Sequence, residues 1–204
     1  MIAVPQTAAL DERLVQTSLE ILAEEGLEGL TLRRVAREAG VSHGAPLRHF
    51  RSLADLLSEV AARGFALLSR ALDTAATTLP PGAGSLARLE AAGRAYVDVA
   101  VANPSLFSLM FRVENLDVTN AAFERDSGTA FEQLLHHVRA AQDAGWRADR
   151  DTRLLAGSVW AAVHGFAALW TQGAFSGPIP GASFEDALAT TLELVLGTTR
   201  GETA

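Results

Sequence analysis

The chain has 204 residues, of which 49% are apolar and none is cysteine, and its formal net charge is −7. This length and composition indicate a globular protein with a sizeable core and exclude a disordered chain. The lack of cysteine excludes a disulfide framework, a thiol nucleophile and a cysteine metal site. The apolar stretch 154–170 follows Arg153 and contains His164, so we expect no membrane-spanning helix. No basic-then-apolar leader begins the sequence, and we expect a cytoplasmic protein.

Charge is distributed unevenly along the chain. The segment 31–52 holds five arginines and one glutamate, a local charge of +4, which leaves −11 for the rest. The distribution of charge matters more for nucleic-acid binding than its sum. A small basic surface in an acidic protein is therefore compatible with DNA binding.

Helical spacing of apolar residues dominates the N-terminal part, and strand alternation is nearly absent. The first predicted helix ends at Gly26. Thr31 is placed to cap a second helix over residues 32–39, and Ser42 to cap a third over residues 43–49.

Longer helices follow, separated by strong breakers. The capping box "SLAD" opens the fourth helix, and "PPGAGS" at 80–85 separates it from the fifth. Asn103-Pro104 starts the sixth, and a second capping box at Ser183–Asp186 opens the last. The predicted ranges are 52–77, 85–103, 104 onward, 121–144, from Asp149 or Asp151 to 173, and 183–196. We therefore expect an all-α fold of about nine helices.

The two short helices before residue 50 meet at Gly40-Val41-Ser42. Gly40 can take the left-handed conformation that ends a helix abruptly. Val41 can bury between the helices, and the small Ala36 lets them cross closely. This is the arrangement of a helix-turn-helix, whose second helix enters the major groove of DNA. Small residues at the start of that helix would let its positively polarised N-terminus approach phosphates.

The segment 31–50 resembles the DNA-binding motif of the TetR family of transcriptional regulators. The matching residues are Thr31, Arg33, Val35, Ala36, Ala39, Gly40, Val41, Ser42, Gly44, His49 and Phe50. Farther along, "NPSLFSLMF" at 103–111 and "WAAVHGFAALW" at 160–170 are similar to segments of the family's C-terminal domains, the second to the tryptophan-histidine-glycine class. The resemblance implies a three-helix DNA-binding head over residues 9–71 and a ligand-binding and dimerisation domain over residues 72–204, assembled as an Ω-shaped homodimer.

The resemblance also implies roles for residues of the head. The implied DNA-binding residues are Thr31, Arg33, Ser42, His43, Gly44, Ala45, Pro46, Leu47, Arg48, His49 and Ser52. Two positions depart from the family pattern, because Leu47 replaces the usual tyrosine and Leu53 the usual lysine. Both changes remove phosphate contacts and predict weaker non-specific binding with a shallower salt dependence. Arg48 and Arg51 are candidates to compensate.

The C-terminal domain is expected to hold an apolar pocket with a few polar groups, as ligand sites usually do. The candidate ligand-binding residues are Tyr96, Phe107, Met110, Phe111, Phe131, Trp160 and His164. In the family the last two long helices form a four-helix bundle with those of a second subunit. The candidate dimer-interface residues are Leu154, Val159, Val163, Phe166, Leu188, Leu192 and Val195.

Simpler explanations stay open for several of these residues. His43 would then be a solvated surface residue, His49 a hydrogen-bonded structural histidine, and Arg37 a partner in a surface ion pair of little energetic value. The aromatic residues would be plain core, with Trp160 in the core or the dimer seam. His164 would be a core or interface histidine.

The sequence predicts a regulator and no enzyme. It contains no G-x-S-x-G, no Gly-rich phosphate loop and no H-E-x-x-H, so we expect no catalytic residue. His136 and His137 diverge around a helix, so we expect no metal and no cofactor. The expected partners are operator DNA, a small apolar or amphipathic effector and a second copy, with the effector releasing a repressor from a palindromic operator. The alternative is a helical small-molecule-binding protein whose head has lost DNA affinity through Leu47 and Leu53.

Overall fold

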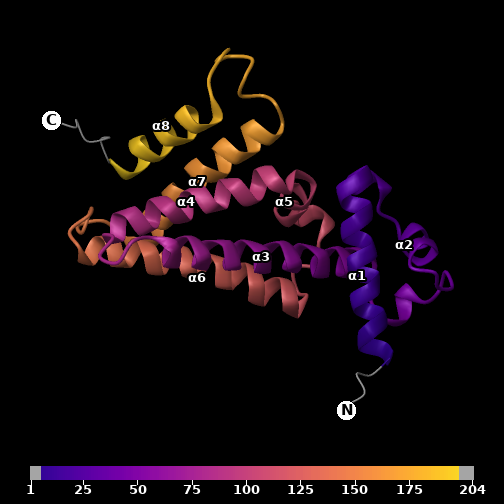
Figure 1. Cartoon of the computed structure of the whole chain (residues 1–204). Coiled ribbons are helices and arrows are strands. Elements are labelled where there is room, and N and C mark those ends of the chain that lie inside the picture. Colours follow the sequence, from indigo (N-terminus) through magenta and orange to yellow (C-terminus); the bar gives the residue numbers. More distant parts are fainter. Residues whose placement is uncertain (1–5, 198–204) are drawn as a thin grey trace. The chain divides into compact units, whose positions relative to one another are not determined.

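A computed structural model of the chain describes residues 6–197, with side chains from Leu10 onward. Helices joined by turns and loops make up these residues, and no strand occurs among them (Figure 1). They form two compact units: unit 1 holds residues 6–66 and 103–127, and unit 2 holds residues 67–102 and 128–197. The predicted all-α fold is confirmed.

Eight α-helices lie within residues 6–197. They are α1 (Gln6–Glu25), α2 (Leu32–Glu38), α3 (Leu53–Thr78), α4 (Ser85–Ala102), α5 (Pro104–Met110), α6 (Ala121–Asp143), α7 (Thr152–Thr171) and α8 (Phe184–Leu196). Three short 3-10 helices are η1 (Leu27–Gly29), η2 (Pro46–Arg48) and η3 (Val113–Asn115). Helices α3 and α6 each begin in unit 1 and continue into unit 2.

The helix ends follow the capping chemistry that the sequence predicts. The Thr31 hydroxyl accepts the N–H of Arg34 at 3.1 Å at the start of α2. The Ser183 hydroxyl caps α8 in the same way, and Asp151 rather than Asp149 caps α7. Gly40 adopts a φ of 67°, which confirms the left-handed stop after α2.

The predicted helix over residues 43–49 is wrong. This part of the chain forms consecutive turns around the single 3-10 helix η2. Backbone hydrogen bonds join residues three apart, such as the Ala45 N–H to the Ser42 carbonyl at 2.9 Å. Pro46 has no N–H to donate, and Gly44 disfavours the helical state. The chain therefore forms the tighter turns of a 3-10 helix instead of an α-helix. We call residues 42–50 the recognition segment.

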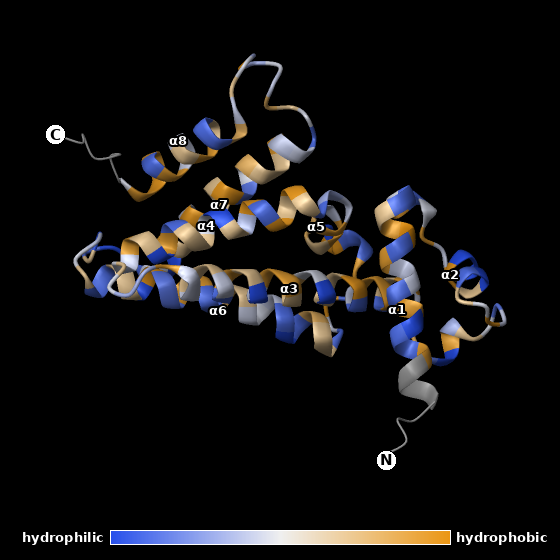
Figure 2. Ribbon diagram, viewed as in Figure 1, coloured by the Kyte–Doolittle hydropathy of each residue, from blue (hydrophilic) through white to orange (hydrophobic). Residues whose placement is uncertain are grey.

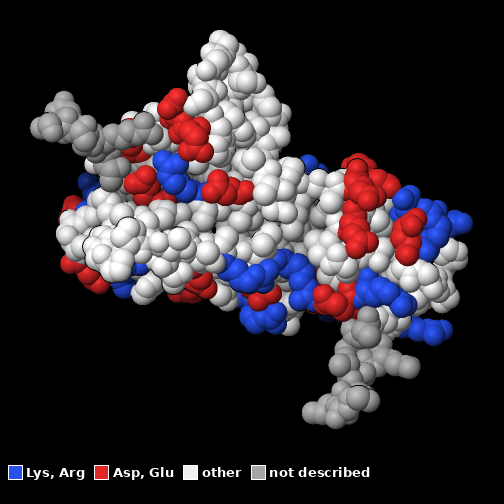
Figure 3. Space-filling model, in the orientation of Figure 1, with Lys and Arg blue, Asp and Glu red and all other residues white. Residues whose placement is uncertain are grey.

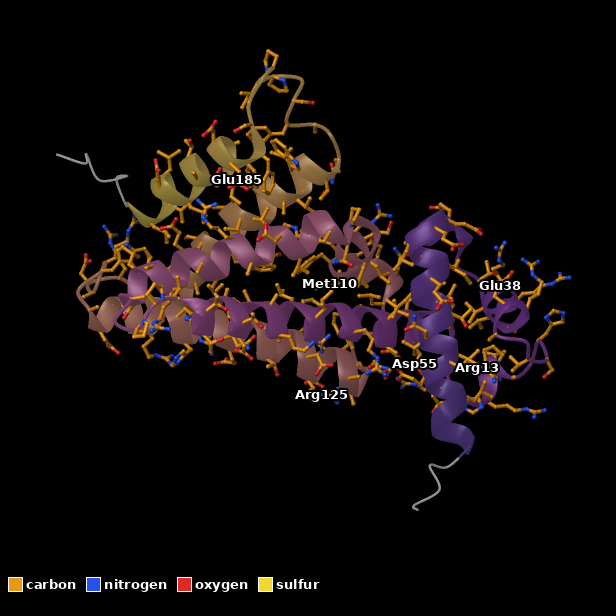
Figure 4. All side chains as sticks on the ribbon, viewed as in Figure 1. Arg13, Glu38, Asp55, Met110, Arg125 and Glu185 are labelled. Carbon is orange, nitrogen blue, oxygen red and sulfur yellow. The ribbon has the colours of Figure 1, made fainter. Side chains whose placement is uncertain are left out.

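Unit 1 packs α1 against α2 and α5. Its fully buried side chains include Leu14, Leu22 and Val35. Close contact between α3 and α5 depends on Gly64, where a Cβ would lie 2.5 Å from the sulfur of Met110. Met110 points toward α3 in Figure 4.

Unit 2 packs α4, α7 and α8 together. Its core cluster includes Leu89, Val138, Val159 and Leu196, and the Trp146 indole N–H donates to the Leu196 carbonyl at 2.7 Å. Helix α7 is apolar along much of its length (Figure 2) and is the one described helix long and apolar enough to cross a membrane by composition alone. Its apolar side chains serve the core on one face and leave another face exposed.

Candidate functional site

The side chains of the recognition segment divide between an inner and an outer face. Ala45, Pro46 and Phe50 are buried in unit 1. Exposed residues 42–44 and 47–48 alternate with buried residues 45–46 and 50, a spacing close to that of a helix although no α-helix forms. The outer face consists of Ser42, His43, Gly44, Leu47 and Arg48, all exposed.

Most of the predicted DNA-binding residues lie on the surface. Thr31 and Arg33 of the α2 region are exposed, as is the outer face of the recognition segment, and Ser52 is half-buried. Ala45 and Pro46 are the exceptions, because their side chains are buried. They support the recognition segment from inside and do not form its outer face.

His49 ties the recognition segment to α1. Its Nδ1 contacts the carboxylate of Asp11, and its side chain is 11% exposed. This contact favours the simpler explanation, in which His49 is a structural histidine. The sequence prediction missed Asp11, which has no motif of its own and meets His49 only in the folded unit.

The arginines of the basic segment differ in how they are paired. Arg34 contacts Glu25 and Glu38, and Arg37 contacts Glu38 at 3.0 Å, which confirms the ion pair considered for Arg37. For Arg33 and Arg48 no carboxylate partner occurs among the residues described. Figure 3 shows arginine side chains around α2 with carboxylates between them. The positive charge left for a phosphate is therefore smaller than the count of arginines indicates.

Arg51 is the exposed end of a polar group that links the start of α3 to the start of α6 and includes the buried Asp55 and Asn120. Its guanidinium contacts the carboxylates of Asp55 at 3.2 Å and Asp117 at 2.8 Å. The Asn120 amide donates to Asp55 at 2.9 Å and to Glu59 at 3.1 Å. We call these five residues the α3–α6 polar cluster, and Asp55 is labelled in Figure 4. Arg51 is thus held by carboxylates rather than left for a phosphate.

The pKa values within the α3–α6 polar cluster follow from these contacts. Burial alone would raise the pKa of Asp55, but hydrogen bonds from Arg51 and Asn120 outweigh burial and lower it. The same hydrogen bond and the nearby carboxylates raise the pKa of Arg51. The capping box is only half formed, because Ser52 accepts the Asp55 N–H while the Asp55 carboxylate accepts the N–H of Arg51.

Sequence reasoning missed the α3–α6 polar cluster. Asn120 lies directly before α6, and its side-chain oxygen Oδ1 accepts the N–H groups of Ala122 and Phe123 at 3.0 Å each. That cap was detectable from the asparagine before an apolar helix. The bond from Asn120 to Asp55 was not detectable, because it joins residues 65 positions apart.

Four of the predicted ligand-binding residues lie in unit 2, and three of them are joined by hydrogen bonds. The Trp160 indole N–H donates to the Tyr96 hydroxyl at 3.1 Å, and that hydroxyl lies 2.9 Å from Nδ1 of His164. Phe131 meets Trp160 edge-on at 6.3 Å between ring centroids. Burial lowers the pKa of His164 and raises that of Tyr96, so both groups are neutral at pH 7.

The other three predicted ligand-binding residues lie in unit 1. Phe107 and Met110 are buried, and the Phe107 and Phe111 rings meet at 5.2 Å between centroids. Phe111 also packs edge-on against Phe65 of α3 at 5.5 Å. Within unit 1 these three residues act as core, which is the simpler explanation considered for them.

The predicted dimer face requires a correction. Five of its seven residues are buried inside unit 2: Val159, Val163, Phe166, Leu188 and Leu192. Their side chains pack within one chain, so they are not available to a partner. Leu154 is 74% exposed and Val195 is half-buried. The apolar residues that α7 and α8 do expose include Leu169 and Leu194, the latter at 76%.

Comparison with known proteins agrees with this architecture. Residues 14–60 match the family described as bacterial regulatory proteins, tetR family, and residues 89–192 match the tetracyclin repressor-like C-terminal domain. The uncharacterized HTH-type transcriptional regulator YobS of Bacillus subtilis (strain 168) is 25% identical over 171 residues, which are 84% of each chain.

Solved structures share the fold over nearly the whole chain. A protein of unknown function from Rhodococcus sp. RHA1 is 30% identical with a TM-score of 0.78, over 92% of this chain and 94% of that one. FadR from Bacillus subtilis, solved in complex with stearoyl-CoA, is 14% identical with a TM-score of 0.68, over 91% of this chain and 97% of that one. Together with the capped helix α2 and the recognition segment of unit 1, these matches show that the chain belongs to the TetR family of bacterial transcriptional regulators.

Proposed function

We propose that this regulator is a repressor that binds operator DNA as a homodimer and that a small apolar or amphipathic effector releases it. The observation that carries the proposal is the outer face of the recognition segment. That face is exposed, carries polar side chains around Leu47, and includes Arg48, for which the described residues offer no carboxylate. The hydrogen-bond donors of this face are therefore available to a phosphate or a base edge.

The proposed dimer face is the exposed side of α7 and α8. Leu154, Leu169 and Leu194 are exposed there, and Gly157 and Gly165 of α7 have open space where a Cβ would stand. Small residues let a partner helix approach closely, and the exposed leucines supply apolar area. A dimer would present two recognition segments to half-sites one helical turn apart, about 34–36 Å.

The effector site is proposed around Tyr96, Trp160 and His164. These side chains combine aromatic surface with polar atoms, as ligand sites do. FadR from Bacillus subtilis, which shares this fold, was solved in complex with stearoyl-CoA, and that complex supports an apolar or amphipathic effector here. The effector would favour a distance between the two recognition segments of the dimer that does not match the half-sites of the operator, and DNA would be released.

We further propose a functional division into a DNA-binding part over residues 9–71 and a regulatory part over residues 72–204. The compact units divide differently, since residues 103–127 pack with the N-terminal residues in unit 1. Coupling between effector and DNA would then involve α3 and α6, which both continue from one unit into the other. A DNA partner also favours a cytoplasmic location.

Selection from a random double-stranded DNA library tests the proposal. The expected product is an inverted repeat whose half-sites are one helical turn apart. Fatty acids and acyl-CoA thioesters, titrated into the complex, are then expected to release the DNA, and a reporter under the selected site should be repressed until such a compound is added. If no sequence is enriched even at low salt, DNA binding is refuted and the alternative, a helical small-molecule-binding protein, takes its place.

A further inference from the structure

Leu47 is an unusual residue on the outer face of the recognition segment. Its side chain is 57% exposed, and it is the one large apolar residue so exposed within residues 10–66. Its neighbours on that face are polar, charged or glycine. An exposed aliphatic side chain among polar groups does not stabilise the free unit. A contact between Leu47 and bound DNA is the simplest explanation for its exposure.

The position of Leu47 is fixed by the turns beneath it. It lies at the centre of η2, between the buried Pro46 and the exposed Arg48. Proline fixes its own φ, and the Phe50 N–H closes the turn on the Pro46 carbonyl at 2.8 Å. The backbone therefore presents Leu47 and Arg48 together on one surface.

A leucine side chain can donate and accept no hydrogen bond, so it can contact only carbon on DNA. Sugar carbons occur in every nucleotide and carry no sequence information. In the major groove the apolar group that distinguishes one base from the others is the C5 methyl group of thymine. We propose that Leu47 recognises a thymine methyl group in each half-site, an inference that rests on the proposed operator binding.

Deoxyuridine substitution tests this contact directly, because it removes the methyl group and leaves the base pair intact. Each thymine of the selected operator is replaced in turn, in both half-sites, and the Kd is measured by fluorescence anisotropy. For the unmodified chain, one position is expected to raise Kd about fourfold per half-site, the factor that follows from burying one methyl-sized group. Leu47→Ala should bind the thymine operator more weakly and lose this sensitivity to deoxyuridine.

The matched control is Val118→Ala, which truncates another exposed aliphatic residue of unit 1 outside the recognition segment. It should keep the full deoxyuridine effect. If no single deoxyuridine changes Kd by more than twofold, or if Leu47→Ala keeps the effect, the inference is refuted while operator binding stands. If no operator is enriched in the selection, the inference and the proposed function fail together.

Discussion

The side chain of Asn120 forms hydrogen bonds to groups of two helices, α3 and α6. Its side-chain oxygen Oδ1 caps α6, and its side-chain NH2 group donates to Asp55 and Glu59 of α3. Asn120→Ala removes the cap and leaves buried carboxylate oxygens without these donors. We expect a loss of about 2–3 kcal/mol in the free energy of unfolding, measured by urea denaturation.

The comparison variant for Asn120 is Ser183→Ala, which removes an exposed cap at the start of α8. It should cost about 1 kcal/mol, because the N–H and the carboxylate of Asp186 that lose the Ser183 hydroxyl are both exposed to water. Equal losses for the two variants would show that the α3–α6 polar cluster adds nothing beyond the cap.

His164 makes stability depend on pH. Burial lowers its pKa, whereas in the unfolded chain the group titrates near the ordinary value of about 6.5. Between the lowered pKa and 6.5 the unfolded chain binds more protons, so the free energy of unfolding falls as pH falls through this range. The stabilising contribution is fully present above pH 6.5.

Urea denaturation of His164→Gln over a pH series checks this expectation. The variant should show a shallower decline of unfolding free energy below pH 6.5, and part of the decline will remain because burial also lowers the pKa of His137. Tyr96→Phe should keep the decline, since burial and not the hydrogen bond is the cause of the lowered pKa at His164. An unchanged slope in His164→Gln would contradict the account.

At the scale of helices, two glycines in helix interiors should respond in opposite ways to alanine. A Cβ at Gly93 of α4 would lie 2.8 Å from Cδ2 of the buried Leu192, whereas a Cβ at Gly128 of α6 would meet nothing within 4 Å. Gly93→Ala is expected to destabilise the protein by about 1–3 kcal/mol through overpacking. Gly128→Ala should stabilise it by about 0.5–1 kcal/mol through helix propensity. Thermal denaturation distinguishes the signs, and two stabilised variants would contradict the close packing of α4 and α8.

Sequence patterns predicted helices well where capping and periodicity agreed, as at Thr31, Asp151 and Ser183. They failed at the recognition segment, where the in-and-out pattern is helical but Gly44 and Pro46 limit the backbone to turns. They also failed to separate the core face of α7 from its exposed face, because both faces are apolar. Contacts between distant residues, such as Asn120 with Asp55, leave no local signal.

At the scale of the whole molecule, the exposed side of α7 and α8 should determine the oligomeric state. Leu194→Glu places a charge on the proposed dimer face, and desolvating that charge opposes association. Sedimentation velocity at micromolar concentration is expected to show a dimer for the unmodified chain and a monomer for the variant. Ile179→Glu, in the loop before α8, should stay dimeric. A monomeric unmodified chain would refute the proposed face.

The central claim is that the recognition segment binds operator DNA, and a salt series by fluorescence anisotropy on the intergenic DNA beside the gene tests it most directly. We expect binding that is tighter than to random DNA and whose affinity falls with salt, because the remaining phosphate contacts release counterions. Arg48→Ala should reduce the salt slope by about one per contacting residue, while Arg37→Ala, already paired with Glu38, should change it little. Affinity no greater than for random DNA at every salt concentration would contradict the claim.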